Sequence, residues 1–241
     1  MEKKPIIEFE NCTKRFGALT VLDNISFSVK GNSLISVLGK SGSGKTTLIR
    51  LLAGLDKLDN GTIHINGEKA NEGNKILIPA RKRNTGFIFQ DLALFPHFTV
   101  FQNIAFGLKV NKENNYRAIV DEVLQQFDIS GLKDKYPNRL SGGQQQLVAL
   151  ARTWVLKPKI LLMDEPMANL DVKLKKQIRL KVRELMKERN VTVFYITHDH
   201  REALELSDKI LLLNNGKIDF YGNSDDLSKS DSTYVKEFIE I

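Results

Sequence analysis

The chain has 241 residues, of which 41% are hydrophobic and 27% charged, and its formal net charge is +7 at pH 7. This length suits one large domain or one domain with an inserted lobe, and the apolar content is sufficient for a folded core. The single cysteine, Cys12, excludes an intramolecular disulfide and a cysteine-rich metal site, and we expect it to be buried in a strand. No apolar run approaches the roughly 18 residues of a membrane span, and the first residues lack a signal-peptide core. We therefore expect a cytoplasmic protein that reaches a membrane only through a partner.

The basic residues are spread along the chain. Their densest run, in residues 173–183, is interleaved with apolar residues at helical spacing. A net charge of +7 would suit nucleic acid or an anionic membrane surface, but this distribution favours an ordinary solvated surface. We expect no nucleic-acid partner.

Short strands and turns dominate the first third of the chain. Residues 6–29 alternate apolar and polar side chains, and 62–65 is a short strand between two Asn-Gly turns. The apolar run 33–38 is predicted to be a buried strand, and 48–53 a helix. Residues 69–84 are polar and are predicted to form a loop.

Helical patterns dominate the middle of the chain, after a predicted strand at 85–89. They cover residues 100–109, 115–127 and 144–156 and predict a helical lobe. Between the strand and the first helix, residues 94–101 form an apolar, aromatic patch without periodicity. Large aromatic side chains serve equally in interior packing and in partner binding, so this pattern leaves both readings open.

Buried strands return in the last third. Residues 159–164 and 191–196 are continuous apolar runs, as expected for strands covered on both faces of a parallel sheet. The chain is further predicted to form helices at 170–189 and 201–206, a hairpin over 209–221, and short helices between 225 and 241.

One motif carries specific chemistry. Gly39, Gly44, Lys45 and Thr46 occupy the fixed positions of the G-x-x-x-x-G-K-[ST] pattern, between a predicted strand and a predicted helix. Glycines allow successive backbone N–H groups to form an anion nest, and the helix adds its positive N-terminal end. Lys45 can reach the outer phosphates of a nucleoside triphosphate, and the Thr46 hydroxyl can ligate Mg²⁺. A plain Gly/Ser turn is the alternative, at odds of about one in a hundred from residue usage.

Two acidic residues follow the strand that ends at Met163. Asp164 at the carboxyl end of a parallel strand faces the crevice where ligands bind, and it suits Mg²⁺, directly or through water. Glu165 points elsewhere and could activate a water molecule. A polar strand end before Pro166 is the alternative, which the phosphate-binding loop makes much less favourable.

A second glycine-containing helix start lies at Leu140–Gln144. Ser141 suits an N-cap, and Gly142 and Gly143 beside a helix N-terminus form another anion nest. One phosphate loop has no evident use for a second nest within the same chain, so this nest could grip the nucleotide of another copy. A simple helix cap is the alternative.

The two halves of the nucleotide site are far apart in sequence. Lys45 and Asp164 are separated by about 120 positions, far more than one βαβ unit of about 30 residues needs. The predicted helical lobe occupies this interval and is therefore an insertion between the two halves.

Together these motifs resemble the ATP-binding subunit of an ABC transporter over essentially the whole chain. Gly39–Thr47 is similar to the Walker A loop, Leu140–Gln144 to the ABC signature, and Ile160–Asp164 to Walker B. Glu165 resembles the catalytic glutamate, Ala168–Asp171 the D-loop. Three single residues also match family positions: Gln90 the Q-loop glutamine, His198 the switch histidine, and Phe16 the aromatic residue that stacks on adenine.

The resemblance implies a fold and domain boundaries. The fold is α/β, a P-loop NTPase (RecA-like) core with an antiparallel β subdomain and an inserted α-helical subdomain. One ABC ATPase domain spans residues 1–241. Residues 1–90 and 156–241 form the nucleotide-binding core with its β subdomain, and 91–155 the helical subdomain that carries the signature.

It also implies a mechanism in which two subunits sandwich two ATP molecules. Glu165 would polarise the attacking water, His198 would position it, and Lys45 would hold the phosphates. Thr46, Gln90 and Asp164 would bind Mg²⁺, while the signature of the partner subunit would touch the γ-phosphate. The implied nucleotide-binding residues are Phe16, Gly39, Lys40, Ser41, Gly42, Ser43, Gly44, Lys45, Thr46, Thr47, Ser141, Gly142, Gly143 and Gln144.

The implied partners are a second like subunit, in a homodimer or heterodimer, and integral membrane permease subunits that contact Leu94–Phe101. An extracytoplasmic substrate-binding protein would act indirectly, and the chain would lie on the cytoplasmic side of the cell membrane, held there by the permease. Dimer closure on ATP and opening after hydrolysis would drive the permease.

Residues 94–100 and 168–174 resemble the importer branch that serves sugars, polyamines, ferric iron and oxyanions. An exporter-type ATPase, or a soluble ABC ATPase acting on nucleic acid, is the alternative; the second usually has a coiled-coil insertion or two fused cassettes, and this sequence has no heptad run. Three residues depart from the family pattern: Lys40 replaces a common Pro, Leu147 a common Arg and His200 a common Gln.

Overall fold

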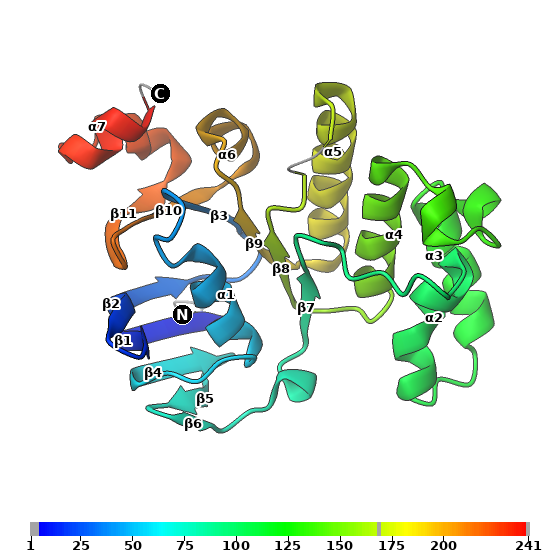
Figure 1. Ribbon diagram of the computed structural model, residues 1–241, viewed down its shortest axis with the longest axis horizontal. Coiled ribbons are helices and arrows are strands. Elements are labelled where there is room, and N and C mark those ends of the chain that lie inside the picture. The colour runs from blue at the N-terminus through cyan, green and yellow to red at the C-terminus, as the bar shows by residue number, and fades with distance from the viewer. Residues whose placement is uncertain (1–4, 168–169, 240–241) are drawn as a thin grey trace.

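The structure is a computed structural model, and it describes residues 5–167 and 170–239. Its backbone forms two β-sheets with helix α1 (Lys45–Ala53) packed between them, and a group of helices that lies beyond the β7 edge of the larger sheet (Figure 1). The expected P-loop core with an antiparallel β subdomain and inserted helices is confirmed by this arrangement and by the family comparison reported below.

The larger sheet has the strand order β11-β10-β3-β9-β8-β7. Its strands are parallel except for β11, which pairs antiparallel with β10. The strands are β3 (Leu34–Leu38), β7 (Thr85–Ile88), β8 (Ile160–Asp164), β9 (Thr192–Ile196), β10 (Lys209–Asn214) and β11 (Lys217–Asn223).

The central strands are apolar at consecutive positions because both faces of the sheet are covered. In β8, Ile160 and Leu162 belong to the core around α1, whereas Leu161 and Met163 belong to the core beneath the helical group. Every residue of β3, β8 and β9 is buried. This confirms the expectation that continuous apolar runs mark strands of a doubly covered parallel sheet.

The parallel strands bring the sequence motifs to one edge of the sheet. Gly39 follows β3, Gln90 lies two residues after β7, Asp164 ends β8, and His198 lies two residues after β9. Ligands of open α/β sheets bind outside the carboxyl ends of the strands. The topology therefore places these residues where a ligand site is expected.

The smaller sheet is antiparallel, with the strand order β2-β1-β4-β5-β6. Cys12 is fully buried in this sheet, as expected, and burial raises its pKa to about 12. The strands are β1 (Ile7–Phe16), β2 (Leu19–Val29), β4 (Asn60–Ile65), β5 (Glu68–Glu72) and β6 (Lys75–Ile76).

The prediction of a loop over residues 69–84 is wrong. Strands β5 and β6 lie in this segment, followed by the 3₁₀ helix η1 (Ala80–Lys82). Polar composition concealed the strands because the inward-facing polar side chain, Asn71, is fully buried and accepts a hydrogen bond of 2.7 Å from Arg83. A buried polar residue with a partner can occupy a position where the strand pattern calls for an apolar one.

The helical group contains α2 (Val100–Val110), α3 (Tyr116–Gln126) and α4 (Gly142–Trp154). Thr99 and Ser141 begin α2 and α4 with capping boxes, in which the glutamine three residues later returns a bond to the cap. The large side chains of Trp154 and Phe127 fill the core between these helices and α5 (Val172–Arg189). The three helices predicted for this lobe are confirmed, with shifts of one or two residues at their ends.

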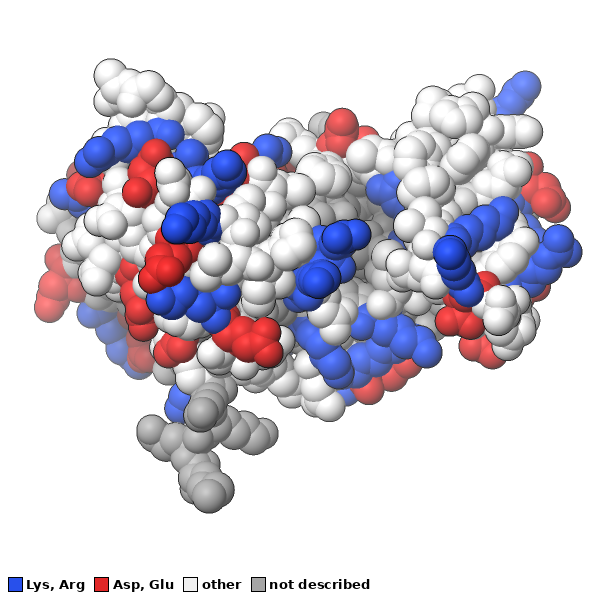
Figure 2. All heavy atoms as spheres, turned by 90° about the horizontal axis from the view of Figure 1, so that it is seen from below, with Lys and Arg blue, Asp and Glu red and all other residues white. Residues whose placement is uncertain are grey.

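The remaining helices are α6 (His200–Leu206), α7 (Thr233–Ile239) and the 3₁₀ helices η2 (Ser130–Leu132), η3 (Pro137–Arg139) and η4 (Ser224–Lys229). Across the described residues, no helix combines the length and the apolarity needed to cross a bilayer. Basic and acidic side chains are interspersed on the face seen in Figure 2. The domain boundaries proposed above stay a prediction.

Candidate functional site

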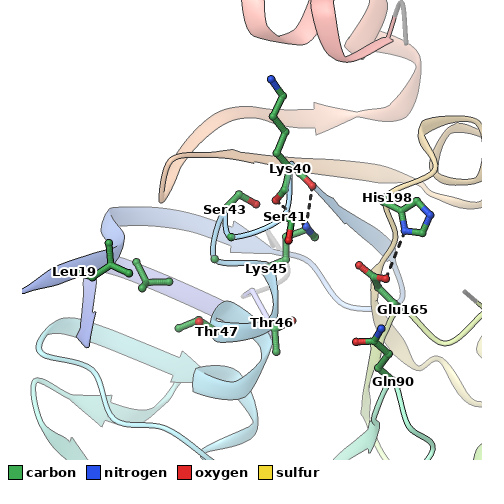
Figure 3. A pocket seen from close by; sticks show the side chains of 14 residues that line it. Leu19, Lys40, Ser41, Ser43, Lys45, Thr46, Thr47, Gln90, Glu165 and His198 are labelled. Carbon is green, nitrogen blue, oxygen red and sulfur yellow. Dashed lines mark hydrogen bonds and ion pairs between the residues drawn. The ribbon is translucent and has the colours of Figure 1, made fainter. Parts of the chain in front are cut away.

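A pocket of about 700 Å³ lies at the carboxyl edge of the parallel strands. One wall is the glycine-rich loop before α1, and the opposite wall carries three side chains from the loops after β7, β8 and β9 (Figure 3). The lining residues are Leu19, Val21, Gly39 to Thr47, Gln90, Glu165 and His198.

The loop owes its shape to glycines at positions that no other residue fits. Gly39 has φ +145°, and a Cβ there would lie 2.3 Å from the carbonyl oxygen of Leu213. Gly44, the N-cap of α1, has φ +102°, and a Cβ would lie 2.8 Å from the carbonyl oxygen of Val21. The loop thus packs closely against neighbouring backbone at these glycines, and its own N–H groups and the N-terminus of α1 can bind an anion.

Lys45 is buried, with 8% of its surface exposed. Its Nζ donates to the carbonyl oxygens of Gly39 at 2.8 Å and Lys40 at 3.1 Å, so the ammonium lies inside the curl of its own loop. Burial lowers the pKa of Lys45, while the nearby carboxylates of Glu165 and Asp164 raise it. The two carboxylates therefore offset only part of the cost of burying the ammonium charge, and phosphate oxygens would be strong hydrogen-bond acceptors for it.

Thr46 and Asp164 meet behind the loop. The Thr46 hydroxyl donates to Oδ1 of Asp164 at 3.1 Å, and Asp164 is buried. Burial raises the pKa of Asp164, against the lowering effect of the Thr46 hydrogen bond. A hydroxyl and a carboxylate at this distance are hard oxygen donors of the kind that Mg²⁺ takes together with phosphate oxygens, so the residues present fit this ion.

Glu165 and His198 face each other across the opposite wall (Figure 3). Oε2 of Glu165 lies 3.5 Å from Nδ1 of His198, longer than an ordinary hydrogen bond, and the side chains are 25% and 66% exposed. Glu165 has φ +43°, a left-handed backbone that is uncommon for a residue with a side chain. Such conformations gather at functional sites, where the surrounding fold holds them.

The turn that carries His198 is fixed from both sides. The Thr197 hydroxyl donates to Glu202 at 2.7 Å and accepts from the Asp199 amide at 3.1 Å. Asp199 caps α6 by accepting from the amides of Arg201 and Glu202. Burial raises the pKa of Asp199, but these amide hydrogen bonds and the nearby His200 and Lys175 together outweigh it and hold that pKa below its usual value. The backbone on either side of His198 is thus set by the start of α6.

Phe16, predicted to stack on a base, does not line this pocket; it is 52% exposed, and Nζ of Lys14 lies 4.8 Å from its ring centre. Leu19, which pairs with Phe16 across the β1–β2 turn, and Val21 line the pocket instead. Sequence reasoning missed both, although an apolar residue such as Leu19, two positions after the turn glycine Gly17, was an available signal. The role of Phe16 stays a prediction.

The second nest is separate from this pocket. Ser141, Gly142, Gly143 and Gln144 form the first turn of α4 and its cap, and Gly142 lines a different cavity of about 210 Å³. Gln90 and Glu165 line both cavities. Within one chain, therefore, the nest does not face the phosphate loop across the 700 Å³ pocket. Ala168 and Asn169, the first half of the segment resembling the D-loop, lie outside the described residues.

The aromatic patch at 94–101 is partly packed and partly open. Phe95 and Phe98 are half-buried, and their rings pack at tilted angles against each other and against Phe106, which is 41% exposed. Asn103, fully buried, donates to the carbonyl oxygens of Phe95 and Phe98 and accepts from the Phe95 amide, so the loop is fixed to α2. Phe95 and Phe106 line an apolar groove of about 400 Å³ with Leu156.

Comparison with known proteins gives a consistent result. The ABC transporter family model matches residues 22–168, more than half of the chain. The probable sulfate/thiosulfate import ATP-binding protein of Chlorella vulgaris is 45% identical over 236 residues, which cover 97% of this chain and 98% of that protein.

Two bacterial relatives are similar over most of this chain. The Fe(3+) ions import ATP-binding protein of Escherichia coli O157:H7 is 43% identical over 94% of this chain and 64% of its own length. The spermidine/putrescine import ATP-binding protein of Aggregatibacter actinomycetemcomitans is 42% identical over 90% of this chain and 58% of its own length. The chain thus spans nearly all of the Chlorella relative and less than two thirds of these two.

Proposed function

We propose, from the premise that this chain belongs to the ABC transporter family and is an importer-type ATPase subunit, that the pocket at the Gly39–Thr47 loop is where it binds and hydrolyses ATP. The family match and the names of the relatives support import, and they do not favour the exporter alternative. The transported molecule is selected by other subunits, because the features described here serve a nucleotide and a protein partner.

The observation that carries the proposal is the facing arrangement of the two pocket walls. The loop and Lys45 form a site for phosphates on one side, and Gln90, Glu165 and His198 project from three different loops on the other. A reacting γ-phosphate and a water molecule fit between them. Positioning and electrostatic stabilisation account for most of the catalysis of phosphoryl transfer.

The phosphate wall acts by charge. On ATP binding, Nζ of Lys45 exchanges the carbonyl oxygens of Gly39 and Lys40 for phosphate oxygens, and its burial makes that attraction stronger than in water. The N–H groups of the loop and of the α1 N-terminus bind the remaining oxygens.

The opposite wall handles the water. Glu165 is the general base, because its carboxylate is three-quarters buried and lies at the pocket surface. His198, next to it and open to the pocket, orients the water and stabilises charge on the γ-phosphate. Thr46 and Asp164 would hold Mg²⁺, with Gln90 completing the ion's ligands; when bound, the ion would neutralise charge on the phosphate oxygens.

A second like subunit completes the site. Ser141, Gly142 and Gly143 at the start of α4 would bind the γ-phosphate held by the partner's loop, since they do not reach their own. Loss of the γ-phosphate would then release the partner and open the dimer.

A membrane permease fits the groove beside Phe95 and Phe106. It is apolar, is lined by residues on both sides of Gln90 in the chain, and has the exposed aromatic side chain of Phe106 in its lining. Docking there would hold the subunit at the cytoplasmic face of a membrane, with a substrate-binding protein acting only through the permease.

The test is the substitution Glu165→Gln, which keeps the shape of the side chain and removes the base. Steady-state ATP hydrolysis should fall about 10²- to 10⁴-fold, while ATP binding measured in the presence of EDTA stays within about twofold. Glu184→Gln, on the exposed face of α5, is the control and should hydrolyse ATP normally. Normal turnover by the Glu165→Gln protein would contradict the assignment.

A further inference from the structure

The loop after Gln90 has an unusual backbone. Leu92 and Ala93 both adopt left-handed conformations, with φ +61° and +44°. The amide of Leu92 donates to the carbonyl oxygen of Phe89 at 2.9 Å, which closes a turn around Gln90 and Asp91. Two consecutive left-handed residues with side chains are unfavourable alone, so other groups must hold them.

Arg152, in the last turns of α4, supplies that hold. Its Nη2 donates to the carbonyl oxygen of Leu92 at 2.8 Å, and its Nη1 donates to that of Ala93 at 2.6 Å. The guanidinium also lies 5.9 Å from the ring centre of Phe95. One side chain thus contacts both strained residues and an aromatic ring of the groove.

The contact requires arginine rather than any cation. Two successive carbonyl groups in left-handed backbone present two acceptors close together, and the planar guanidinium fork offers two N–H groups to match them. A lysine ammonium would reach one acceptor at a time. Arg152 and the Ser141 cap lie at opposite ends of the same helix, which spans Gly142–Trp154.

We infer that Arg152 is a positioning residue for hydrolysis: it fixes the turn that holds Gln90 at the pocket and makes α4 and that turn move together. It touches no nucleotide itself. Helix α4 begins with the nest for the ATP held by the partner subunit. The Arg152 hydrogen bonds therefore link the state of that nucleotide site to Gln90, the metal-binding side chain of this subunit's own site. This inference rests on the proposed role of Gln90.

The experiment compares ATP hydrolysis at saturating ATP over a range of free Mg²⁺ concentrations. The variants are Gln90→Ala, Arg152→Gln, Arg152→Lys and the double variant Gln90→Ala/Arg152→Gln. Arg189→Gln is the matched control, because Arg189 likewise donates to a carbonyl oxygen and stacks on a ring, both of Trp154, away from the Gln90 turn. Thermal unfolding of each variant reports stability separately.

We expect Arg152→Gln to need several-fold more Mg²⁺ for half-maximal turnover and to hydrolyse ATP about tenfold more slowly, as a displaced ligand would cause. ATP binding in EDTA should be unchanged, and Arg152→Lys should recover part of the loss. The double variant should be no worse than Gln90→Ala alone, because both changes act through one side chain. Arg189→Gln should keep the wild-type metal dependence.

A merely structural arginine would give a different pattern. The inference would be overturned, and the proposed function left intact, if Arg152→Gln kept the wild-type Mg²⁺ dependence of hydrolysis while Gln90→Ala needed more Mg²⁺. Additive losses of activity in the double variant would have the same meaning. If Gln90→Ala kept the wild-type Mg²⁺ dependence of hydrolysis, that result would contradict the proposed role of Gln90 and this inference with it. If Arg152→Gln does not fold, the same comparison is decided with Arg152→Lys.

Discussion

Replacing Arg83 with methionine is expected to destabilise the chain by about 3 kcal/mol, although Arg83 lies outside the nucleotide pocket. The side chain is 2% exposed and fills the space between the C-terminal end of α1 and strand β5. Its five acceptors are the carbonyl oxygens of Leu51, Leu52, Ala70 and Ile78 and Oδ1 of Asn71, at 2.7 to 3.3 Å.

The magnitude follows from which acceptors keep another donor. The Leu51 oxygen also accepts from the Gly54 amide, and the Ala70 oxygen from two amides of the β6 region. The other three lose the bond from Arg83, at about 2 kcal/mol each. Burial lowers the pKa of Arg83 to about 10, so removing the cation relieves about 3 kcal/mol of desolvation. About 3 kcal/mol of net loss remains.

The assay is thermal unfolding of the nucleotide-free protein followed by circular dichroism. A loss of about 3 kcal/mol should lower Tm by about 6 to 12 °C in a chain of this size. Arg81→Met, two positions away and exposed, is the control and should change stability by less than about 0.5 kcal/mol. Arg83→Lys should not rescue, because a buried cation remains while its fork of donors is lost. A Tm shift for Arg83→Met no larger than that of the control would refute this reasoning.

Two further predictions concern Asp164, which contacts the phosphate-binding loop through Thr46, and the glycines of that loop. Asp164→Asn should raise Tm of the nucleotide-free protein at pH 7 while abolishing Mg²⁺-dependent hydrolysis. Because burial raises the pKa of Asp164, its negative charge opposes folding above that pKa, and the gain in Tm should shrink as the pH falls through that pKa. A lower Tm for the variant at pH 7 would contradict this. Gly44→Ala should lower the free energy of unfolding by about 2 kcal/mol or more and abolish ATP binding, because the added Cβ meets Val21 and Leu22. Gly42→Ala, whose Cβ meets open space, should lower the free energy of unfolding by about 1 kcal/mol. Equal losses for the two variants in chemical denaturation would argue against a steric cause.

Much of the site could be predicted because several of its residues belong to short motifs of neighbouring residues in the sequence. The loop from Gly39 to Thr46 needs a fixed spacing, and Asp164 and Glu165 follow a strand that its apolar run identifies. Parallel topology then brings Gln90 and His198 to the same edge without any local signal, and here the family resemblance supplied the residues.

Tertiary partners account for what was missed. Strand β5 reads as a loop because Asn71 is polar, and only Arg83 reveals why that position is buried. Arg152 and Asn103 are ordinary helix residues in sequence, and their roles come from carbonyl groups that folding brings to them. No pattern within one helix encodes such contacts.

We propose that each ATP site is shared between two copies of the chain. Lys45→Ala removes the phosphate ligand of the loop. Gly142→Asp places a negative charge in the nest, at an exposed position where a Cβ meets only ordinary contact and where an acidic residue suits a helix N-terminus. Each variant alone should be inactive while remaining folded.

The decisive measurement is ATP hydrolysis by an equal mixture of the Lys45→Ala and Gly142→Asp proteins. In a mixed dimer one site has both defects, and the other combines an intact loop with an intact nest. Since half of randomly paired dimers are mixed, the mixture should recover about a quarter of wild-type turnover. A mixture no more active than the two variants measured separately would contradict the composite site.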